Sequence, residues 1–301
     1  MPSTDQRETF ESILVERPAP AVYRITLNRP QTRNAQDVTM LYELNQAFDI
    51  AARDDDISVI ILAANGPHFS SGHDLDIYGF ADEMAQWDPV GVWCGFTCKG
   101  AEGRMGIEKE LFTGLPERWR NIPKVTIAQV HGKVISGALA LAWLCDLIVA
   151  ADNTSFADLT VNLGVAGAEY FNHPWELGIR KAKEFAFTAD FIDAKEAHRL
   201  GMVNHVAPLD DLGNFTLALA RKIAEKPRFA LRTLKEALNA AQDAQGRLST
   251  QNHAFALHQL THSHNEQVYG LPIDPSSLPP QIQEKLLAGR DKALAKAKEE
   301  D

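Results

Sequence analysis

Two segments of the chain share one construction: an apolar strand, a turn of small residues and then a helix. The first is VIILAANGPHFSSGHDL (59–75) and the second is VTIAQVHGKVISGALALAWLCD (125–146). The first N–H groups of a helix are unpaired, and small residues at such a turn let a ligand oxygen approach the backbone. A single turn of this kind is most often a simple chain reversal. Two that converge would form an oxyanion hole, with fixed donors where negative charge develops.

The elements around these turns must bring them together. The continuous apolar run 58–63 predicts a strand that is buried on both faces, and 124–130 and 146–150 predict two more strands. Helical spacing of apolar residues predicts an amphipathic helix over 37–53. Further strands are expected at 12–16, 21–27 and 202–206, and helices at 108–120, 136–144, 169–177, 180–187, 193–199, 208–225, 228–244 and over most of 250–300. The alternation predicts an α/β core over residues 1–206 and a helical C-terminal region over 207–301.

One stretch, 76–107, has no clear period. It is interpreted either as a lid or pocket wall, since long irregular segments are often functional, or as a surface insertion.

Composition limits the possible partners and compartment. The 301 residues are 45% hydrophobic and 23% charged, an ordinary globular balance. The net charge of −10 argues against nucleic acid as a partner. Three cysteines, an odd and small number, favour a reducing compartment. The chain has no apolar run of about 18 residues and no apolar N-terminal signal core, so a cytoplasmic protein without a membrane partner is expected.

Four blocks in order carry a family resemblance: NRPQTRNA (28–35), FSSGHDL (69–75), QVHGKVISGALALAWLCD (129–146) and HRLGMVNHV (198–206). Together they resemble the enoyl-CoA hydratase/isomerase family, also called the crotonase superfamily, from about residue 12 to 244. The resemblance implies a crotonase-like spiral of strand-strand-helix turns. It also implies C-terminal helices that pack on neighbouring subunits, in a homotrimer or a hexamer.

The resemblance also implies the ligand, an acyl-CoA. Coenzyme A is then part of the substrate, and no separate cofactor or metal is expected. The two oxyanion donors map to the backbone N–H groups of His73 and Gly137. The second turn reads ISGA where many members carry three glycines, and its residues remain small enough for close approach.

Six further residues match positions that contact the substrate or coenzyme A in the family. Arg33 and Lys235 resemble cationic positions near the nucleotide, with a solvated surface charge as the alternative for each. The others lie within the matched motifs and are Ala35, Ser71, Asp74 and Leu75.

The chain departs from the hydratase pattern at the residues that position water. Typical hydratases carry two glutamates, and the corresponding positions here are Ala140 and Thr160. Alanine cannot transfer a proton, and a threonine hydroxyl is a poor base at neutral pH. The standard two-glutamate hydration mechanism is therefore not expected.

Two carboxylates could replace them. Some superfamily members use an acidic residue about eight positions past the second glutamate, and a shift of one residue brings Glu169 there. Asp158, two residues before Thr160, is the second candidate. The alternatives are a carboxylate at a helix N-terminus for Glu169 and a turn or ion-pair residue for Asp158.

The histidines have both functional and structural interpretations. The side chain of His73 could line the pocket and shuttle protons, although its backbone alone explains its position. His131 is expected to pack or to form a hydrogen bond. Only His258 and His262 of the C-terminal histidines have i,i+4 spacing, and no acidic residue joins them at matching spacing. A solvated or subunit-interface role is expected for them, not metal binding.

The sequence thus predicts a catalyst of proton transfer beside a thioester, through an enolate. Double-bond isomerisation suits a single carboxylate, because one group can remove and return a proton. The alternatives are a hydratase with a non-standard water site, a hydrolase or C–C cleaving enzyme, and an acyl-CoA-binding protein without catalysis.

Overall fold

The computed structural model describes residues 10–75 and 79–299 and is built around a six-stranded sheet. The strands are β1 (Ile13–Ala19), β2 (Val22–Leu27), β3 (Val59–Ala64), β4 (Val125–Val130), β6 (Leu147–Ala151) and β9 (His205–Ala207), in that spatial order. β1 and β2 form an antiparallel hairpin, and every later neighbour in the sheet is parallel.

Both faces of this sheet are buried, as the continuous apolar run 58–63 predicted for β3. Along β3, Ile60 and Leu62 face one core cluster, whereas Val59 and Ile61 face another. The first cluster contains α1 (Val38–Arg53) and α5 (Gly137–Trp143), and the second contains α9 (Leu212–Ala224). Alternation along each strand therefore sends side chains to opposite faces, and helices cover both.

A smaller three-stranded sheet lies beside the second small-residue turn. It consists of β5 (Lys133–Ile135), β7 (Ser155–Ala157) and β8 (Ile192–Asp193), with β7 in the middle. β5 leads directly into α5, so this sheet fixes the turn at Ser136 and Gly137 between the two. No apolar period marks such short strands, and the sequence did not predict them.

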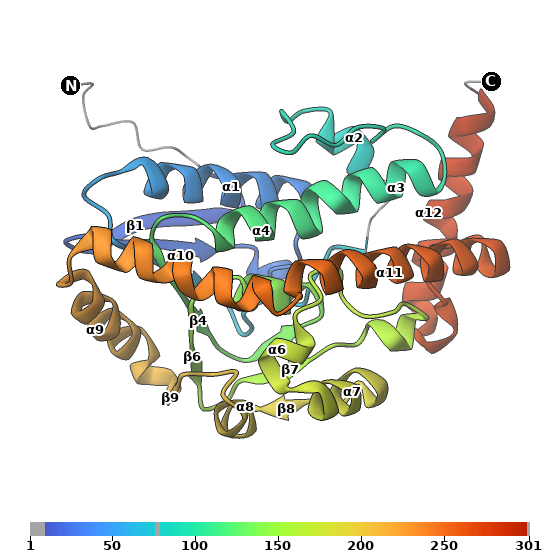
Figure 1. Cartoon of the computed structure of the whole chain (residues 1–301). Helices are drawn as coiled ribbons and strands as arrows, with labels where there is room; N and C mark the ends of the chain where they lie inside the picture. Colours follow the sequence, from blue (N-terminus) through green and yellow to red (C-terminus); the bar gives the residue numbers. More distant parts are fainter. Residues whose placement is uncertain (1–9, 76–78, 300–301) are drawn as a thin grey trace.

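The remaining helices surround this core (Figure 1). They are α2 (Phe80–Met84), α3 (Ala101–Glu108), α4 (Leu115–Arg120), α6 (His173–Leu177), α7 (Ile179–Thr188), α8 (Ala194–Leu200), α10 (Arg228–Ala244), α11 (Arg247–Tyr269) and α12 (Pro280–Glu299). A π-helical turn, Lys109–Gly114, joins α3 to α4, so the helix expected over 108–120 begins earlier, at Ala101. Of the irregular stretch, residues 76–78 lie outside the described residues.

The predicted start of one helix is wrong, and the error concerns Glu169. The helix expected over 169–177 begins only at His173, where Pro174 occupies the first turn. Glu169 therefore lies in the preceding loop and is not the N-terminal carboxylate of a helix. In the described part of the chain, no helix combines the length and the apolar composition that a bilayer crossing requires.

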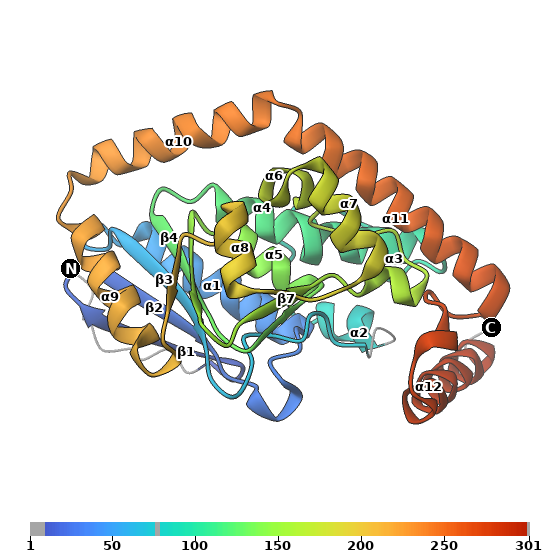
Figure 2. The same cartoon turned by 90° about the horizontal axis from the view of Figure 1, so that it is seen from below.

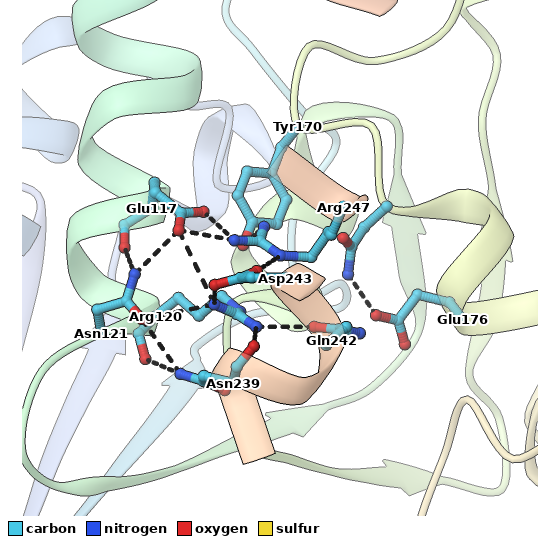
Figure 3. Close-up of polar contacts among 10 residues, drawn as sticks. Glu117, Arg120, Asn121, Tyr170, Glu176, Asn239, Gln242, Asp243 and Arg247 are labelled. Atoms are coloured by element: carbon cyan, nitrogen blue, oxygen red, sulfur yellow. Dashed lines mark hydrogen bonds and ion pairs between the residues drawn. The ribbon is translucent and has the colours of Figure 1, made fainter. Parts of the chain in front are cut away.

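Helices α10 and α11 follow one another along one edge of the molecule, and α12 lies at the far end (Figure 2). An ion-pair network around Arg247 attaches α10 and α11 to α4 (Figure 3). Arg247 is fully buried, and its guanidinium donates to Glu117 at 2.7 Å and to Asp243 at 2.6 Å. Arg120 joins the same group through Asp243 at 3.3 Å. These charges fix the position from which α11 reaches the loop that carries Glu169.

Candidate active site

The two small-residue turns meet, as the oxyanion hypothesis requires. Ser70 pairs with Val134 and Gln36 pairs with His73 in isolated parallel bridges. Gly72 is at the point of closest approach, where an added Cβ would lie 2.8 Å from the Ile135 carbonyl oxygen and 3.3 Å from the Gly137 nitrogen. Its φ of +95° is also one that residues with side chains rarely adopt. Glycine at position 72 is thus required for the contact between the turns.

The bridge with Gln36 fixes the direction of the His73 N–H group. Gln36 donates to the Gly72 carbonyl at 2.9 Å and accepts from the Asp74 N–H at 2.9 Å. In a parallel bridge the residue between these two partners directs its own N–H to the opposite side. Gly137 is the first residue of α5, so its N–H has no partner within the helix. Neither N–H donates a hydrogen bond to an acceptor among residues 10–75 and 79–299.

Ser136 holds the second turn in an uncommon conformation. Its φ of 48° and ψ of −109° are strained for a residue with a side chain. The surrounding contacts enforce it: Ser136 N–H donates to the Ala157 carbonyl at 2.9 Å, and its Oγ accepts from the Leu159 N–H at 3.0 Å. A serine can thus replace a glycine here because β7 and the residues after it hold the turn in place.

The His73 imidazole lies directly over the second turn. A Cβ added at Gly137 would lie 2.5–2.7 Å from three atoms of the ring, which stacks on Phe112 with 3.6 Å between centroids. Nε2 is 3.1 Å from Glu169 Oε2. Nδ1 is buried without a hydrogen-bond partner in the described residues. Because a carboxylate only accepts, Nε2 carries a proton in this contact, and Nδ1 is the nitrogen that has the lone pair when the ring is neutral.

Glu169 lies between two histidines. Its other oxygen, Oε1, is 3.4 Å from His258 Nε2, and the residue is 7% exposed. Burial by itself would raise the pKa of Glu169, but His73 and His258 outweigh it and hold this pKa well below its ordinary range. Burial would likewise lower the pKa of His258, yet the carboxylates of Glu169 and Glu108 raise it to about 9. Glu169 is therefore an ionised carboxylate held between imidazole groups.

Ala140 and Thr160, the residues predicted to correspond to the hydratase glutamates, have other surroundings and roles in this structure. Ala140 is buried within α5, and the Thr160 hydroxyl donates to Asp158 Oδ1 at 2.7 Å. The threonine is thus engaged in fixing a neighbouring carboxylate.

Asp158 forms an interior pair with His173, which the sequence did not single out. Asp158 Oδ2 is 2.8 Å from His173 Nε2, and both side chains are 1% exposed. The same oxygen accepts from the Ala168 N–H at 3.1 Å. Burial would raise the pKa of Asp158, but these partners hold it below its ordinary value. The pair holds the backbone next to Glu169, which matches the ion-pair alternative for Asp158.

The predicted coenzyme A residues differ in their surroundings. Arg33 is exposed in a left-handed conformation, and its carbonyl accepts from the Ser71 N–H at 3.0 Å. Ala35, Ser71 and Asp74 are half-buried beside it, and Leu75 is 39% exposed. Lys235 is buried, with Nζ 2.9 Å from Asp146 Oδ2 and 2.9 Å from the Lys124 carbonyl. This placement gives no support to a phosphate contact from Lys235, which stays a prediction.

Three residues lie on the side of Glu169 away from His73, and from the sequence one of them was missed and the other two were given a different role. Glu108, at the end of α3, lies 3.4 Å from His258 Nε2 and 3.5 Å from His262 Nε2. The two histidines are buried within this chain, so a solvated role is wrong for both. Their i,i+4 spacing was the only sequence feature that grouped them, because Glu108 is 150 residues away from His258.

Comparisons with known proteins show the family to which the chain belongs. The family model described as enoyl-CoA hydratase/isomerase matches residues 18–88 and 95–271. A Mycobacterium tuberculosis protein named as an enoyl-CoA hydratase, EchA13, is 47% identical over 82% of this chain and 79% of its own length.

Two solved structures are also similar. One, from Mycobacterium smegmatis and named as an enoyl-CoA hydratase, has a TM-score of 0.78 and 41% identity, covering 87% of this chain and 99% of its own. The other, named as an enoyl-CoA hydratase/isomerase from Xanthobacter autotrophicus Py2, has a TM-score of 0.72 and 28% identity. The match covers 94% of this chain and 98% of the other.

Proposed function

Because the chain belongs to the enoyl-CoA hydratase/isomerase family, we propose that it moves a double bond within an acyl-CoA thioester by proton transfer. The observation that carries this proposal is the contact between His73 and Glu169 beside the two free N–H groups. The thioester oxygen would accept from the N–H groups of His73 and Gly137, which acidifies the α-carbon.

The proton would move through the His73 ring, with Glu169 as its partner. Glu169 holds the imidazole at Nε2, so Nδ1 would take a proton from the α-carbon of a 3-enoyl thioester and leave a dienolate. Return of that proton to the γ-carbon gives the 2-enoyl isomer, with no water consumed. Nδ1 lies next to Gly137, since a Cβ there would be 2.7 Å from it. This distance supports the proposal that the proton carrier works beside an oxyanion donor.

A second candidate function is hydration. The relatives named above as enoyl-CoA hydratases favour it, and the His73–Glu169 pair could activate a water molecule in place of two glutamates. Ala140 and Thr160 argue for isomerisation, because neither can position that water as a carboxylate does.

The two functions differ in their products. The protein would be incubated in D₂O with 2-enoyl-, 3-enoyl- and 3-oxoacyl-CoA thioesters, and products followed by mass spectrometry. Deuterium at the α- or γ-carbon without a gain of water is expected. A gain of water would replace isomerisation with hydration, and binding without exchange of any thioester would leave an acyl-CoA-binding protein.

The catalytic pair is tested by substitution. Glu169→Gln is expected to lower the exchange rate about 10²–10⁴-fold, the usual contribution of a positioned acid–base group. His73→Ala keeps the backbone N–H and is expected to abolish exchange while acyl-CoA still binds. Glu225→Gln, at an exposed carboxylate, is the matched control and should exchange at the wild-type rate. Unchanged turnover in Glu169→Gln would remove Glu169 from the mechanism.

The same proposal includes a homotrimer or a hexamer. Helix α10 exposes large apolar side chains, with Phe229 at 76%, Leu234 at 58% and Leu238 at 64%. A monomer rarely leaves such a row of apolar groups in water. Light scattering coupled to gel filtration measures the subunit number.

A further inference from the structure

A group of buried side chains next to the proposed catalytic pair is suited to hold a metal ion. Glu108, His258 and His262 each offer one ligand atom, and these atoms lie within 4.8 Å of one another. The residues are 8%, 2% and 7% exposed. Figures 1 and 2 show α3, which ends at Glu108, beside α11, which carries both histidines. The cluster therefore joins two elements far apart in the sequence.

Both imidazoles are oriented as metal ligands usually are. His258 Nδ1 lies 2.7 Å from the Gly167 carbonyl and His262 Nδ1 lies 2.5 Å from the Pro272 carbonyl. A carbonyl can only accept, so each Nδ1 carries a proton, and each Nε2 is the atom that would offer a lone pair to a metal ion once the ion displaces any proton held there. This arrangement, an Nδ1–H donated to a backbone carbonyl, fixes the tautomer and raises the basicity of the coordinating nitrogen.

Glu108 is oriented in the same way. Its Oε2 accepts from the Gln259 side-chain amide, and Gln259 in turn accepts from Arg104 at 3.2 Å. Its Oε1 faces His262 Nε2 at 3.5 Å and has no hydrogen-bond donor among the described residues. The carboxylate thus keeps one oxygen for a cation.

The charges in the cluster require a cation between them. The two Nε2 atoms are 2.8 Å apart, and two lone pairs cannot face one another at that distance without a proton or a metal between them. His258 Nε2 is 3.4 Å from both Glu108 Oε2 and Glu169 Oε1. Ligand atoms on a tetrahedral zinc ion lie about 3.3 Å apart, from the usual zinc–ligand lengths. The carboxylates are at that spacing, and the two histidines would separate by about 0.5 Å to reach it.

We propose that Glu108, His258 and His262 form a binding site for a divalent transition-metal ion of the zinc type. Two imidazoles and one carboxylate suit such an ion, whereas Mg²⁺ and Ca²⁺ prefer oxygen ligands. Glu169 Oε1 stands next to the fourth position. The ion would fasten α11 to α3 and fix the side of Glu169 that faces away from His73.

Metal content tests the site independently of turnover, so failure of the isomerase proposal would leave it intact. Untagged protein is titrated with Zn²⁺ against a chromophoric chelator and analysed by plasma mass spectrometry after dialysis. One equivalent of Zn²⁺ per chain is expected, with little uptake of Mg²⁺ under the same conditions. Co²⁺ as a probe should give the visible absorption of a four-coordinate nitrogen and oxygen site.

Substitutions locate the ion. His262→Gln and Glu108→Gln are each expected to weaken Zn²⁺ binding more than about 100-fold, beyond the usual effect of losing a residue that only orients a ligand. His264→Gln, an exposed histidine on the same helix, is the matched control and should bind Zn²⁺ as the wild type does.

Two results would overturn the proposal. One is a wild-type protein that takes up no stoichiometric Zn²⁺ and gives no Co²⁺ absorption, which would show that the cation between the histidines is a proton. The other is Zn²⁺ uptake that survives unchanged in His262→Gln and Glu108→Gln. The wild-type titration decides the first point even where a variant fails to fold.

Discussion

Replacing Gly137 by alanine tests whether the His73 ring takes part in the reaction. The new Cβ would lie 2.5 Å from His73 Cε1, and ordinary carbon contacts need about 3.5–4.0 Å. The ring would have to move by about 1 Å, yet Phe112 stacks on its other side at 3.6 Å between centroids. The hydrogen bond to Glu169 should therefore break, although both backbone N–H groups remain in the chain.

The expected magnitudes separate activity from stability. Overpacking costs about 1–3 kcal/mol, and replacing a helical glycine by alanine returns up to about 1 kcal/mol. The free energy of unfolding should therefore fall by only about 0–3 kcal/mol. Loss of a positioned acid–base pair lowers the rate about 10²–10⁴-fold, equivalent to about 3–5 kcal/mol in the barrier.

Activity is measured as the rate of deuterium incorporation from D₂O into the thioester. Stability is measured by urea denaturation. Gly213→Ala is the control, because Gly213 lies in α9 and an added Cβ there would meet nothing within 4 Å. It should be as active as the wild type and no less stable. A folded Gly137→Ala protein whose rate stays within about threefold of the wild type would refute a role for the His73 ring, given the usual size of such contributions.

Two further predictions concern the buried charges. Arg247→Met should lower the free energy of unfolding by about 2–4 kcal/mol in urea, because it removes the closer of the two cations that Glu117 and Asp243 share and leaves them with Arg120 alone. A loss below about 0.5 kcal/mol would show that the network contributes nothing net. Asp158→Asn should cost about 3 kcal/mol at pH 7. Because the folded pKa of Asp158 is depressed, the difference in unfolding free energy between the wild type and Asp158→Asn should be full above the unfolded pKa of about 4. It should shrink as the pH falls below that value. A difference in urea melts that does not change with pH would contradict the ion pair.

The sequence alone determined the features that depend on local order. The apolar run of β3 was visible because a strand buried on both faces lacks alternation, and the segments of β4 and β6 were also predicted as strands. The two small-residue turns were visible as motifs, and so were the alanine and threonine at the glutamate positions. From these the family, the α/β core and the helical C-terminal region followed, and the fold and the comparisons confirm them.

Only the tertiary structure decided which side chains act together. Glu169 contacts His73 across 96 residues of chain, and the turn around Glu169 is irregular, so no period could indicate that contact. Glu108 meets His258 and His262 because α11 crosses α3, which depends on the path of the whole C-terminal region. Periodicity and propensity encode how neighbouring residues are arranged, whereas contacts between distant segments follow from the packing of complete elements. For this reason the sequence predicted the two turns that carry the proposed oxyanion donors, and the fold supplied the charged groups around them.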